Sequence, residues 1–153
     1  MASGAVSRPV WVYVDGVFDM LHAGHIAFMK QARALGDHLI VGVHSDDDVA
    51  TYKPRPILSY QERRAMVETC RLVDRTLEFP APLRVTVEDL DAYGADFVVH
   101  GDDFSAEQME FWYGHLVPSG RIKVVRYTAG IASRQIVERI ANRLRDGSLR
   151  IKL

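Results

Sequence analysis

Short segments that are apolar on both faces of a β-strand constrain the fold of this chain more than any other feature. Val10–Val14 reads VWVYV, and Leu39–Val43 and Phe97–Val99 repeat the design as LIVGV and FVV. Ile122–Tyr127 predicts a further strand, and Arg75–Phe79 predicts a weaker one. Strands without a polar face are typical of a parallel sheet that helices cover on both sides.

Helical patterns lie between these strands. Apolar residues recur at helical spacing from Phe28 to Leu35, and Gly36 is placed to cap the end of that helix. Residues 134–145 carry apolar side chains along one face and predict an amphipathic helix. Three capping-box spacings predict further helix starts, at Ser59-x-x-Glu62 with a helix running to Cys70, at Thr86-x-x-Asp89 and at Ser105-x-x-Gln108.

Strands and helices that alternate with short links predict a single doubly wound, Rossmann-like α/β domain. Its sheet is expected to be parallel, with right-handed crossovers and helices on both faces. Ligands of such folds bind beyond the carboxyl ends of the strands, where the strand order reverses. We expect the domain to span residues 1–146, with 147–153 as a tail or the start of a linker to a further C-terminal domain.

The composition excludes several other classes of protein. Of 153 residues, 48% are hydrophobic and 25% charged, and the net charge is -1, which argues against disorder. Nineteen basic and twenty acidic residues give no nucleic-acid signature, and no apolar run is long enough for a membrane span. The single cysteine, Cys70, excludes an internal disulfide framework, and no secretory signal pattern opens the chain. These features predict a cytoplasmic protein.

The segment Val14–His25, VDGVFDMLHAGH, carries the strongest functional signal. A strand ends at Gly16, a loop follows, and His22 and His25 stand where a helix begins. Gly16 and Gly24 allow the backbone to approach a ligand closely, and the free N–H groups of a helix start favour anions. Imidazoles there can donate hydrogen bonds to phosphate oxygens as negative charge grows on them.

Two alternatives remain for this histidine pair. His22-x-x-His25 has a spacing that metal sites use, but a zinc site needs three or four ligands and no Cys-rich or His-rich cluster follows. Histidines that only satisfy a structural role are the second alternative. The strand–glycine–loop–helix context favours a ligand-binding role over both.

VDGVFDMLHAGH resembles the H-x-G-H signature of the nucleotidyltransferase superfamily, and specifically its cytidylyltransferase branch. The resemblance covers about residues 10–142 and continues through GVHSDDDVA, YKPRPILSYQERRAMVETCRLVDRTLEFP and LDAYGADFVVHGDD. It is strongest to the CTP:phosphoethanolamine cytidylyltransferases, whereas the glycerol-3-phosphate and phosphocholine cytidylyltransferases are more distant. H-x-G-H alone is a moderate signal, but four motifs in order are a strong one.

The resemblance implies roles for the signature and the loop after it. His22 and His25 match the histidines that bind CTP phosphates and stabilise the transition state, and Val17 and Phe18 match loop backbone that contacts the nucleotide. Lys53 matches a lysine that neutralises phosphate in the active-site cleft.

The resemblance also implies roles for further charged residues. A Pro-rich loop that carries Lys53 and Arg55 suits an anion clamp, although a solvated charged loop is the commoner alternative. Arg63 and Arg71 match arginines of the next helix, and surface ion pairs are the alternative for both. Asp102 matches an acidic residue near the cytidine, with helix capping as its alternative.

The last motif departs from the family pattern, R-T-x-G-[IV]-S-T-T. When the chain is aligned on Gly130-Ile131, Ser133 replaces the first threonine and Arg134 the second, while Arg126 lies one residue further back. We expect all five residues to contact the nucleotide, with Ser133 also capping the helix. Arg134 would replace a hydroxyl with a charge.

The resemblance implies transfer of CMP from CTP to a small alcohol that bears a phosphate or a phosphonate. Candidate acceptors are a phosphoethanolamine-like compound and 2-hydroxyethylphosphonate, as in fosfomycin-type pathways. Mg²⁺ is expected to accompany the triphosphate, and no protein side chain is assigned to it. The resemblance also implies a homodimer, and neither nucleic acid nor membrane is expected as a partner.

Several points stay open in the sequence. The aromatic residues between Phe104 and Tyr113 fit a core or dimer interface, or the lining of an acceptor pocket. No carboxylate–aromatic cage for an amine is evident, which favours an uncharged acceptor tail. An adenylyltransferase on the same scaffold and a degenerate nucleotide-binding module, which the altered last motif would fit, are the alternative functions.

Overall fold

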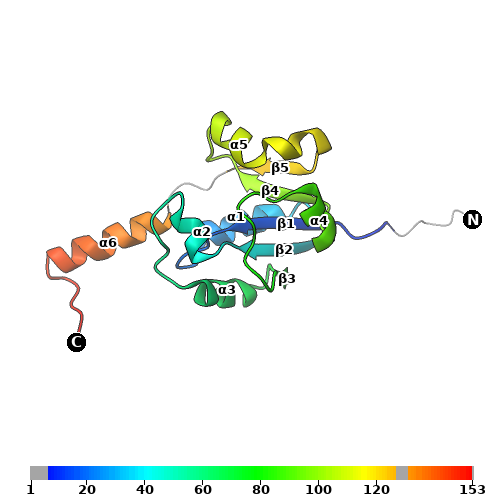
Figure 1. Cartoon of the computed structure of the whole chain (residues 1–153). Helices are drawn as coiled ribbons and strands as arrows, with labels where there is room; N and C mark the ends of the chain where they lie inside the picture. The colour runs from blue at the N-terminus through cyan, green and yellow to red at the C-terminus, as the bar shows by residue number, and fades with distance from the viewer. Residues whose placement is uncertain (1–6, 127–130, 153) are drawn as a thin grey trace, which may run out of the picture.

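A computed structural model describes residues 7–126 and 131–152 and contains a five-stranded sheet of order β3-β2-β1-β4-β5 (Figure 1). Every neighbouring pair of strands is parallel. The strands are β1 Trp11–Gly16, β2 His38–Val43, β3 Arg75–Thr76, β4 Phe97–Gly101 and β5 Ile122–Val125. The predicted Rossmann-like α/β fold with a parallel sheet is thereby confirmed.

Three helices begin at the predicted capping boxes, where the side-chain oxygens of Ser59, Thr86 and Ser105 accept backbone hydrogen bonds. A short helix capped by Ser45 and a 3₁₀ helix were not predicted. The helices are α1 Ala23–Arg33, α2 Asp46–Ala50, α3 Tyr60–Glu68, α4 Val87–Tyr93, α5 Ala106–Tyr113, the 3₁₀ helix η1 Gly114–Ser119 and α6 Ser133–Arg145.

Several predicted boundaries are wrong. The strand expected at Arg75–Phe79 keeps only Arg75 and Thr76 in the sheet, and the strand expected at Ile122–Tyr127 ends at Val125. Helix α1 ends with Ala34 as its C-cap instead of Gly36; a side chain at Gly36 would meet the Val10 carbonyl at 2.9 Å. Helix α3 ends at Glu68, before Cys70.

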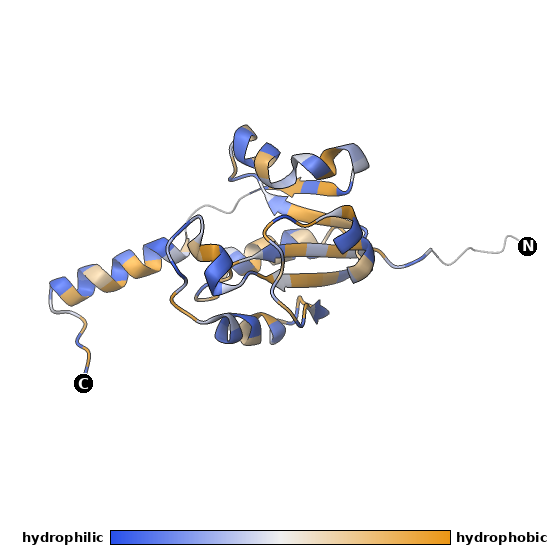
Figure 2. Ribbon diagram, viewed as in Figure 1, coloured by the Kyte–Doolittle hydropathy of each residue, from blue (hydrophilic) through white to orange (hydrophobic). Residues whose placement is uncertain are grey.

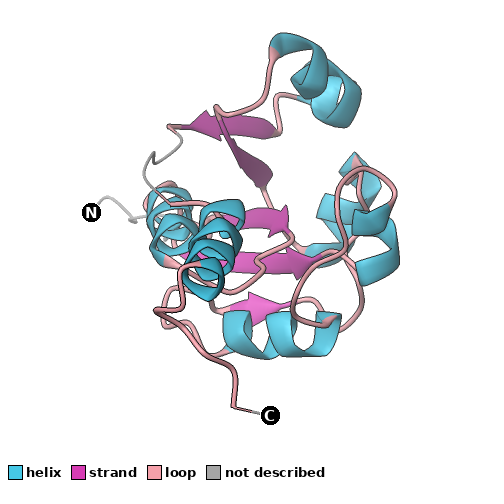
Figure 3. Cartoon of the chain, turned by 90° about the vertical axis from the view of Figure 1, so that its left-hand side faces the viewer, coloured by secondary structure: helices cyan, strands magenta, loops and turns pink. Residues whose placement is uncertain are grey.

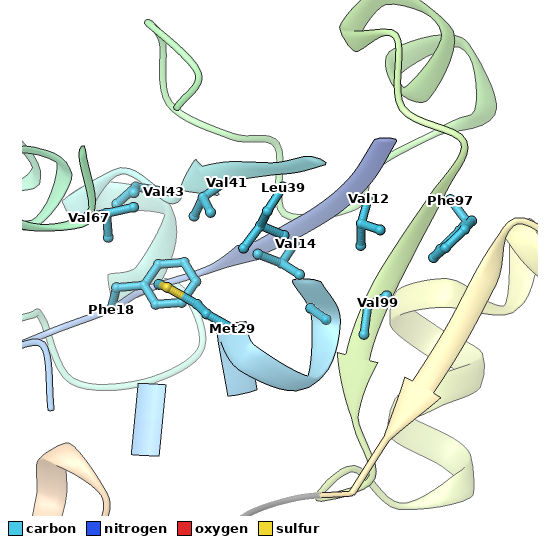
Figure 4. Packing of buried hydrophobic residues seen from close by; sticks show 11 residues of the cluster. Val12, Val14, Phe18, Met29, Leu39, Val41, Val43, Val67, Phe97 and Val99 are labelled. Carbon is cyan, nitrogen blue, oxygen red and sulfur yellow. The ribbon is translucent and has the colours of Figure 1, made fainter. Parts of the chain in front are cut away.

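Helices cover both faces of the sheet. On one face Val12 and Val14 of β1 pack against Met29 of α1 and Val67 of α3 (Figure 4). On the other face a second buried cluster centres on Tyr13 of β1 and includes side chains of α4, α5 and η1. Because side chains alternate along a strand, β1 supplies both clusters, which is why it is apolar throughout most of its length.

Helix α6 differs from the other helices. It extends away from the sheet, and its apolar and polar residues alternate along it (Figures 1 and 2). None of its residues is buried, and Val137, Ile140 and Leu144 are each about two-fifths exposed. The predicted amphipathic helix is therefore present, but no other described segment covers its apolar face. No helix among the described residues has the length and apolarity needed to span a bilayer.

The strand order places a ligand site between β1 and β4. The chain passes from β1 to β2 on one side of β1, whereas β4 pairs with its other side. Figure 3 looks along the sheet from the side of α6. Loops and α6 gather at the carboxyl ends of the strands, where the reversal of strand order predicts ligand binding.

Candidate active site

A cavity of about 640 Å³ opens at these carboxyl ends, a volume typical of small-molecule sites. It is lined by the ends of β1 and β4, the signature loop, the Lys53 loop and the start of α6. The cavity brings together most of the predicted site residues, namely Gly16, Val17, Phe18, His22, Gly24, His25, Lys53, Arg55, Arg126, Ile131, Ser133 and Arg134.

His22 and His25 form a capping box in which imidazoles take the usual places of Ser and Glu. His22 Nδ1 accepts a hydrogen bond from the Gly24 N–H at 3.1 Å, and His25 Nδ1 accepts one from the His22 N–H at 3.2 Å. The two rings stack with centroids 3.8 Å apart. Since each Nδ1 is an acceptor, the hydrogen of each neutral ring is on Nε2.

Both histidines resist protonation. Burial lowers the pKa of His25 to about 4, with help from neighbouring His22 and Lys53 and against the attraction of Asp19. Burial also lowers the pKa of His22. At neutral pH the pair therefore presents two neutral rings, each with one Nε2–H donor, on the lining of the cavity. Donors of this kind stabilise charge that develops on phosphate oxygens.

The glycines of the signature allow close backbone packing. A Cβ on Gly24 would lie 2.8 Å from the Ile131 carbonyl oxygen, and one on Gly16 would lie 3.2 Å from the Phe18 ring. The close approach expected at Gly24 is therefore to the backbone of residue 131. It joins the signature to the segment before α6.

The loop before His22 is held in a strained conformation by a buried arginine. Phe18 and Met20 have φ values of 52° and 48°, a region that side chains disfavour. Arg63 is fully buried and donates to the carbonyls of Val17, Leu58 and His44. It also pairs with Asp46 at 2.7 Å. Arg63 does not line the cavity, and the alternative of a surface ion pair is wrong because its side chain has no exposed surface.

Asp19 joins three segments, and sequence analysis missed it. Its carboxylate accepts hydrogen bonds from the N–H groups of Ile57 and Leu58 at 2.8 and 3.0 Å. Its backbone carbonyl accepts one from Ser133 Oγ at 2.9 Å. The sequence shows an acidic residue inside the signature, but it shows neither its burial nor its partners, which are far away along the chain. Asp19 thus fixes the end of the Lys53 loop against the signature.

Ser133 does not cap α6 as predicted. The N-cap is Ala132, and Ser133 is the first helical residue. Its hydroxyl is engaged by Asp19 and lies 3.4 Å from His22 Nε2. Ser133 is therefore beside the histidine pair, although its capping role is absent.

Lys53 and Arg55 both line the cavity but differ in their surroundings. Burial lowers the pKa of the Lys53 amine, and the nearby Asp19 carboxylate opposes this shift. Arg55 is 60% exposed and pairs with Asp47 at 2.8 Å. Both residues are exposed, but Arg55 is paired with Asp47 whereas Lys53 has no ion pair among the described residues, so Lys53 is the better placed for contact with a phosphate.

Arg71 and Asp102 are not brought to the cavity. Arg71 is exposed and follows the end of α3. Asp102 is exposed after β4, its N–H donates to the Val125 carbonyl at 2.9 Å, and the neighbouring Asp103 lines the cavity in its place.

The described residues of the altered last motif line the cavity at and just before the start of α6. Arg126 lines the cavity, and its carbonyl accepts a hydrogen bond from Gln31 at 2.8 Å. The Arg134 side chain is 85% exposed and pairs with Glu138 at 3.3 Å. Gly130 lies outside the described residues.

A buried carboxylate at the end of β1 is the main feature that sequence analysis missed. The side chain of Asp15 is 3% exposed and lines the cavity. Its Oδ1 accepts a hydrogen bond from Tyr113 at 3.0 Å, whereas Oδ2 has no hydrogen-bond partner among the described residues. Burial raises the pKa of Asp15, and His44 and His100 oppose the shift.

One residue of the predicted aromatic segment, Tyr113, contacts this carboxylate. Tyr113 is buried, and Trp112 packs edge-on against Tyr52 with centroids 5.3 Å apart. Phe111 is 59% exposed, so the predicted aromatic segment divides between the core and the surface. Neither Tyr113 nor Trp112 is among the described residues that line the cavity, so the expected absence of a carboxylate–aromatic cage for an amine stays a prediction.

Comparison with known proteins agrees with this geometry. Residues 13–139 match the family described as cytidylyltransferase-like. The chain is 39% identical to an ethanolamine-phosphate cytidylyltransferase of Dictyostelium discoideum over 92% of its length, and 38% identical to that of Mus musculus over 87%. It is 37% identical to choline-phosphate cytidylyltransferase A of Rattus norvegicus over 87%. The chain spans only 39%, 33% and 37% of these three relatives.

Solved structures give the same result for the fold. A lipopolysaccharide core biosynthesis protein from Thermoplasma volcanium superposes with a TM-score of 0.65 at 26% identity, over 81% of this chain and 100% of that one. A pantoate-beta-alanine ligase from Francisella tularensis superposes with a TM-score of 0.51 at 15% identity, over 94% and 72% of the two chains. The family match covers most of the chain and includes the histidine pair, Lys53 and the start of α6. The chain therefore belongs to the cytidylyltransferase-like family.

Proposed function

We propose that this chain transfers CMP from CTP to a phosphate oxygen of a small phospho-alcohol and releases pyrophosphate. The observation that carries the proposal is the pair of neutral imidazoles with Nε2–H donors beside Lys53, on a cavity at the strand ends. The family match and the names of the relatives, which are ethanolamine-phosphate and choline-phosphate cytidylyltransferases, support CTP as the nucleotide.

The reaction requires positioning and charge stabilisation more than covalent chemistry. An acceptor phosphate oxygen attacks the α-phosphorus in line and forms the new P–O bond. The bond from the α-phosphorus to the bridging oxygen breaks, and its electron pair leaves with pyrophosphate. His22 and His25 donate hydrogen bonds to oxygens on which charge accumulates, and Lys53 neutralises phosphate charge.

The cavity fits Mg²⁺ that arrives with the triphosphate. The described residues contain no group of three or more His, Cys, Asp or Glu side chains placed to hold a metal. Mg²⁺ commonly uses one or two carboxylates together with phosphate oxygens and water, so such a group is not required. Asp103 is the exposed carboxylate of the lining that a phosphate-bound ion would meet. When bound, the ion neutralises charge on the triphosphate.

We propose phosphoethanolamine as the acceptor because of Asp15. A buried carboxylate with an unpartnered oxygen is unfavourable unless a donor or a cation meets it. The ammonium of phosphoethanolamine supplies both, and the cavity gives it access to Asp15. The uncharged tail of 2-hydroxyethylphosphonate supplies a hydroxyl donor without a charge and would leave Asp15 uncompensated.

A pyrophosphate-release assay tests these proposals. CTP and ATP are each combined with phosphoethanolamine, phosphocholine, glycerol-3-phosphate and 2-hydroxyethylphosphonate. We expect the highest kcat/KM for CTP with phosphoethanolamine. Equal turnover with ATP would support an adenylyltransferase, preference for the phosphonate would overturn the acceptor, and no release with any pair would support a nucleotide-binding module.

We also propose that the chain is a homodimer, as its resemblance to the cytidylyltransferases implies. Light scattering measures the mass in solution directly. A monomeric mass at micromolar concentration would contradict this proposal and leave the proposed reaction unaffected.

A further inference from the structure

We infer that Tyr52 is a positioning residue for the Lys53 ammonium, and that Trp112 holds the Tyr52 ring in place for this role. The inference rests on the proposed function, in which Lys53 neutralises phosphate charge. It assigns a role to two aromatic side chains that are not among the described residues lining the cavity, whereas Lys53 is one of them.

The backbone of the Lys53 loop is held on both sides of the lysine. Before it, the N–H groups of Tyr52 and Lys53 donate to the Val49 carbonyl of α2 at 3.2 and 3.1 Å. After it, two N–H groups at the end of the loop donate to the Asp19 carboxylate. A fixed backbone does not fix the ammonium, because a lysine side chain has a flexible four-carbon stem. The position of the charge therefore depends on side-chain contacts.

The Lys53 ammonium lies over the face of the Tyr52 ring. Its Nζ is 5.5 Å from the ring centroid, within the range of a cation–π interaction. No hydrogen bond or ion pair with a described residue holds this nitrogen. Burial raises the pKa of Tyr52 to about 12, and the nearby Asp15 carboxylate adds to the shift, so the phenol is neutral at neutral pH. A ring face attracts the charge without using a conventional acceptor, so the three N–H donors can meet phosphate oxygens.

Trp112 supports the Tyr52 ring from α5. The two rings meet edge to face, with centroids 5.3 Å apart and an interplanar angle of 61°. Trp112 is partly buried and packs against the buried cluster of the second sheet face. The next residue, Tyr113, is 4% exposed and donates to Asp15. Tyr52 itself is 44% exposed, so a ring that the loop alone would leave mobile rests on a helix that is anchored in the core.

These contacts place the charge before a phosphate arrives. A donor that is already aimed at the site costs no reorganisation when its acceptor binds. Without the ring, the Lys53 side chain populates more rotamers, and ordering it on a phosphate costs conformational entropy. Loss of the Tyr52 ring should therefore weaken phosphate binding, although the ring is outside the described lining of the cavity.

The experiment is a double-mutant cycle on binding, which needs no turnover. CTP and inorganic pyrophosphate are each titrated calorimetrically, with Mg²⁺ present, into the wild type, Tyr52→Leu, Lys53→Met and the double variant. Tyr52→Phe keeps the ring and removes the hydroxyl. Phe79→Leu is the matched control, because Phe79 is also about half exposed, packs against the Tyr93 ring and is not among the described lining residues.

We expect Lys53→Met to weaken both ligands about tenfold to a hundredfold, the range for a lost hydrogen bond to a charged group. Tyr52→Leu should weaken them about twofold to fivefold, the affinity ratio that corresponds to an exposed cation–π contact. In the Lys53→Met background, Tyr52→Leu should have no further effect, because the ring acts through the ammonium. Tyr52→Phe and Phe79→Leu should match the wild type.

The same loss from Tyr52→Leu with and without the lysine would overturn the inference, since the ring would then act independently of the ammonium. Tighter binding by Tyr52→Leu would also overturn it, because the ring would compete with the phosphate for the charge. A loss in Tyr52→Phe as large as in Tyr52→Leu would assign the effect to the hydroxyl and exclude the ring. If Tyr52→Leu fails to fold, the same cycle with Trp112→Leu decides the question.

The proposed function is judged by a different arm of the cycle. Unchanged binding of CTP and pyrophosphate in Lys53→Met would overturn the proposed role of Lys53, and the inference with it. Weakening by Lys53→Met together with independent losses from Tyr52→Leu would overturn the inference alone.

Discussion

The two ends of the active site are built differently. The signature loop is held by buried groups: Arg63 donates to the Val17 carbonyl, and Asp19 accepts from the end of the Lys53 loop. The two histidines also contact each other through the His22 N–H and His25 Nδ1. At the opposite rim the Arg134 side chain is 85% exposed, and α6 buries no residue. The atoms that we propose meet the developing charge are thus held by the fold, whereas the Arg126 and Arg134 side chains, before α6 and at its start, are exposed to solvent.

The largest effect on stability is expected from Arg63→Met. The Val17, Leu58 and His44 carbonyls lose their donor, which costs about 1–3 kcal/mol of unfolding free energy for each carbonyl that stays buried, whereas Asp46 is 22% exposed and can regain water. Arg64→Met is the control on the same helix: Arg64 pairs with the exposed Glu68, a contact worth about 0–1 kcal/mol, and donates to one carbonyl, that of Leu77, so its loss should be smaller. Chemical denaturation measures both, and similar losses in the two variants would contradict a special role for Arg63.

The next effect concerns catalysis by the histidine pair. His22→Asn and His25→Asn keep an acceptor near the position of Nδ1 and remove the Nε2–H donor. A side chain of this length can accept the capping hydrogen bond, as Asp89 does from the Thr86 N–H at the start of α4. We expect kcat to fall by about 10²–10³, the cost of one lost electrostatic donor, with little change in CTP affinity. Single-turnover rates and melting curves measure this. A large loss of folding with intact kcat in the folded fraction would make the pair structural.

The same burial predicts a dependence of stability on pH. The pKa of His25 is about 4 in the folded chain and about 6.5 when exposed, so the unfolded state binds the extra proton between these values. Unfolding free energy should therefore fall as pH decreases from about 6.5 to about 4, by up to roughly 3 kcal/mol at 1.4 kcal/mol per pKa unit. Denaturation midpoints across this range, compared with those of His25→Asn, measure the contribution. An identical slope in the variant would exclude it.

Sequence patterns predicted the fold well because its signals are local. The doubly apolar strands and the capping boxes at Ser59, Thr86 and Ser105 each depend on neighbouring residues, and all became elements of the structure. The motif residues of the cavity were also found, since they follow one another in the signature. Asp15 was missed as a binding group, because its partner Tyr113 is 98 residues away and only the folded chain shows that Oδ2 lacks a donor.

Arg63 was found by its motif, but its contacts could not be predicted from the sequence. The resemblance to the family, through SYQER, identified it as a site residue, but a motif match does not reveal whether a guanidinium faces a ligand or a carbonyl. The structure places it beneath the signature loop, where its effect on the histidines is indirect.

The smallest effect is expected at the exposed rim. If Arg134 is a triphosphate ligand, Arg134→Thr should raise the KM for CTP about threefold to tenfold, less than a buried charged contact would, because solvent screens the side chain. The KM for the acceptor should stay nearly unchanged, since the proposed acceptor contact, Asp15, is buried at the end of β1 and not in α6. Steady-state kinetics with each substrate varied in turn separates the two constants.

Glu138→Gln is the control that sharpens this test. It removes the ion pair at 3.3 Å and leaves Arg134 free to turn toward the cavity, so the KM for CTP should stay the same or fall. An unchanged KM in a well-folded Arg134→Thr variant would place the arginine with ordinary surface residues, whose substitution changes stability or binding by about 0.5 kcal/mol at most. Arg126, which also lines the cavity, and Ser133 beside His22 would then have to hold the triphosphate without it. In that case the rim built from α6 would contribute a hydroxyl and backbone groups to the site, and no charge.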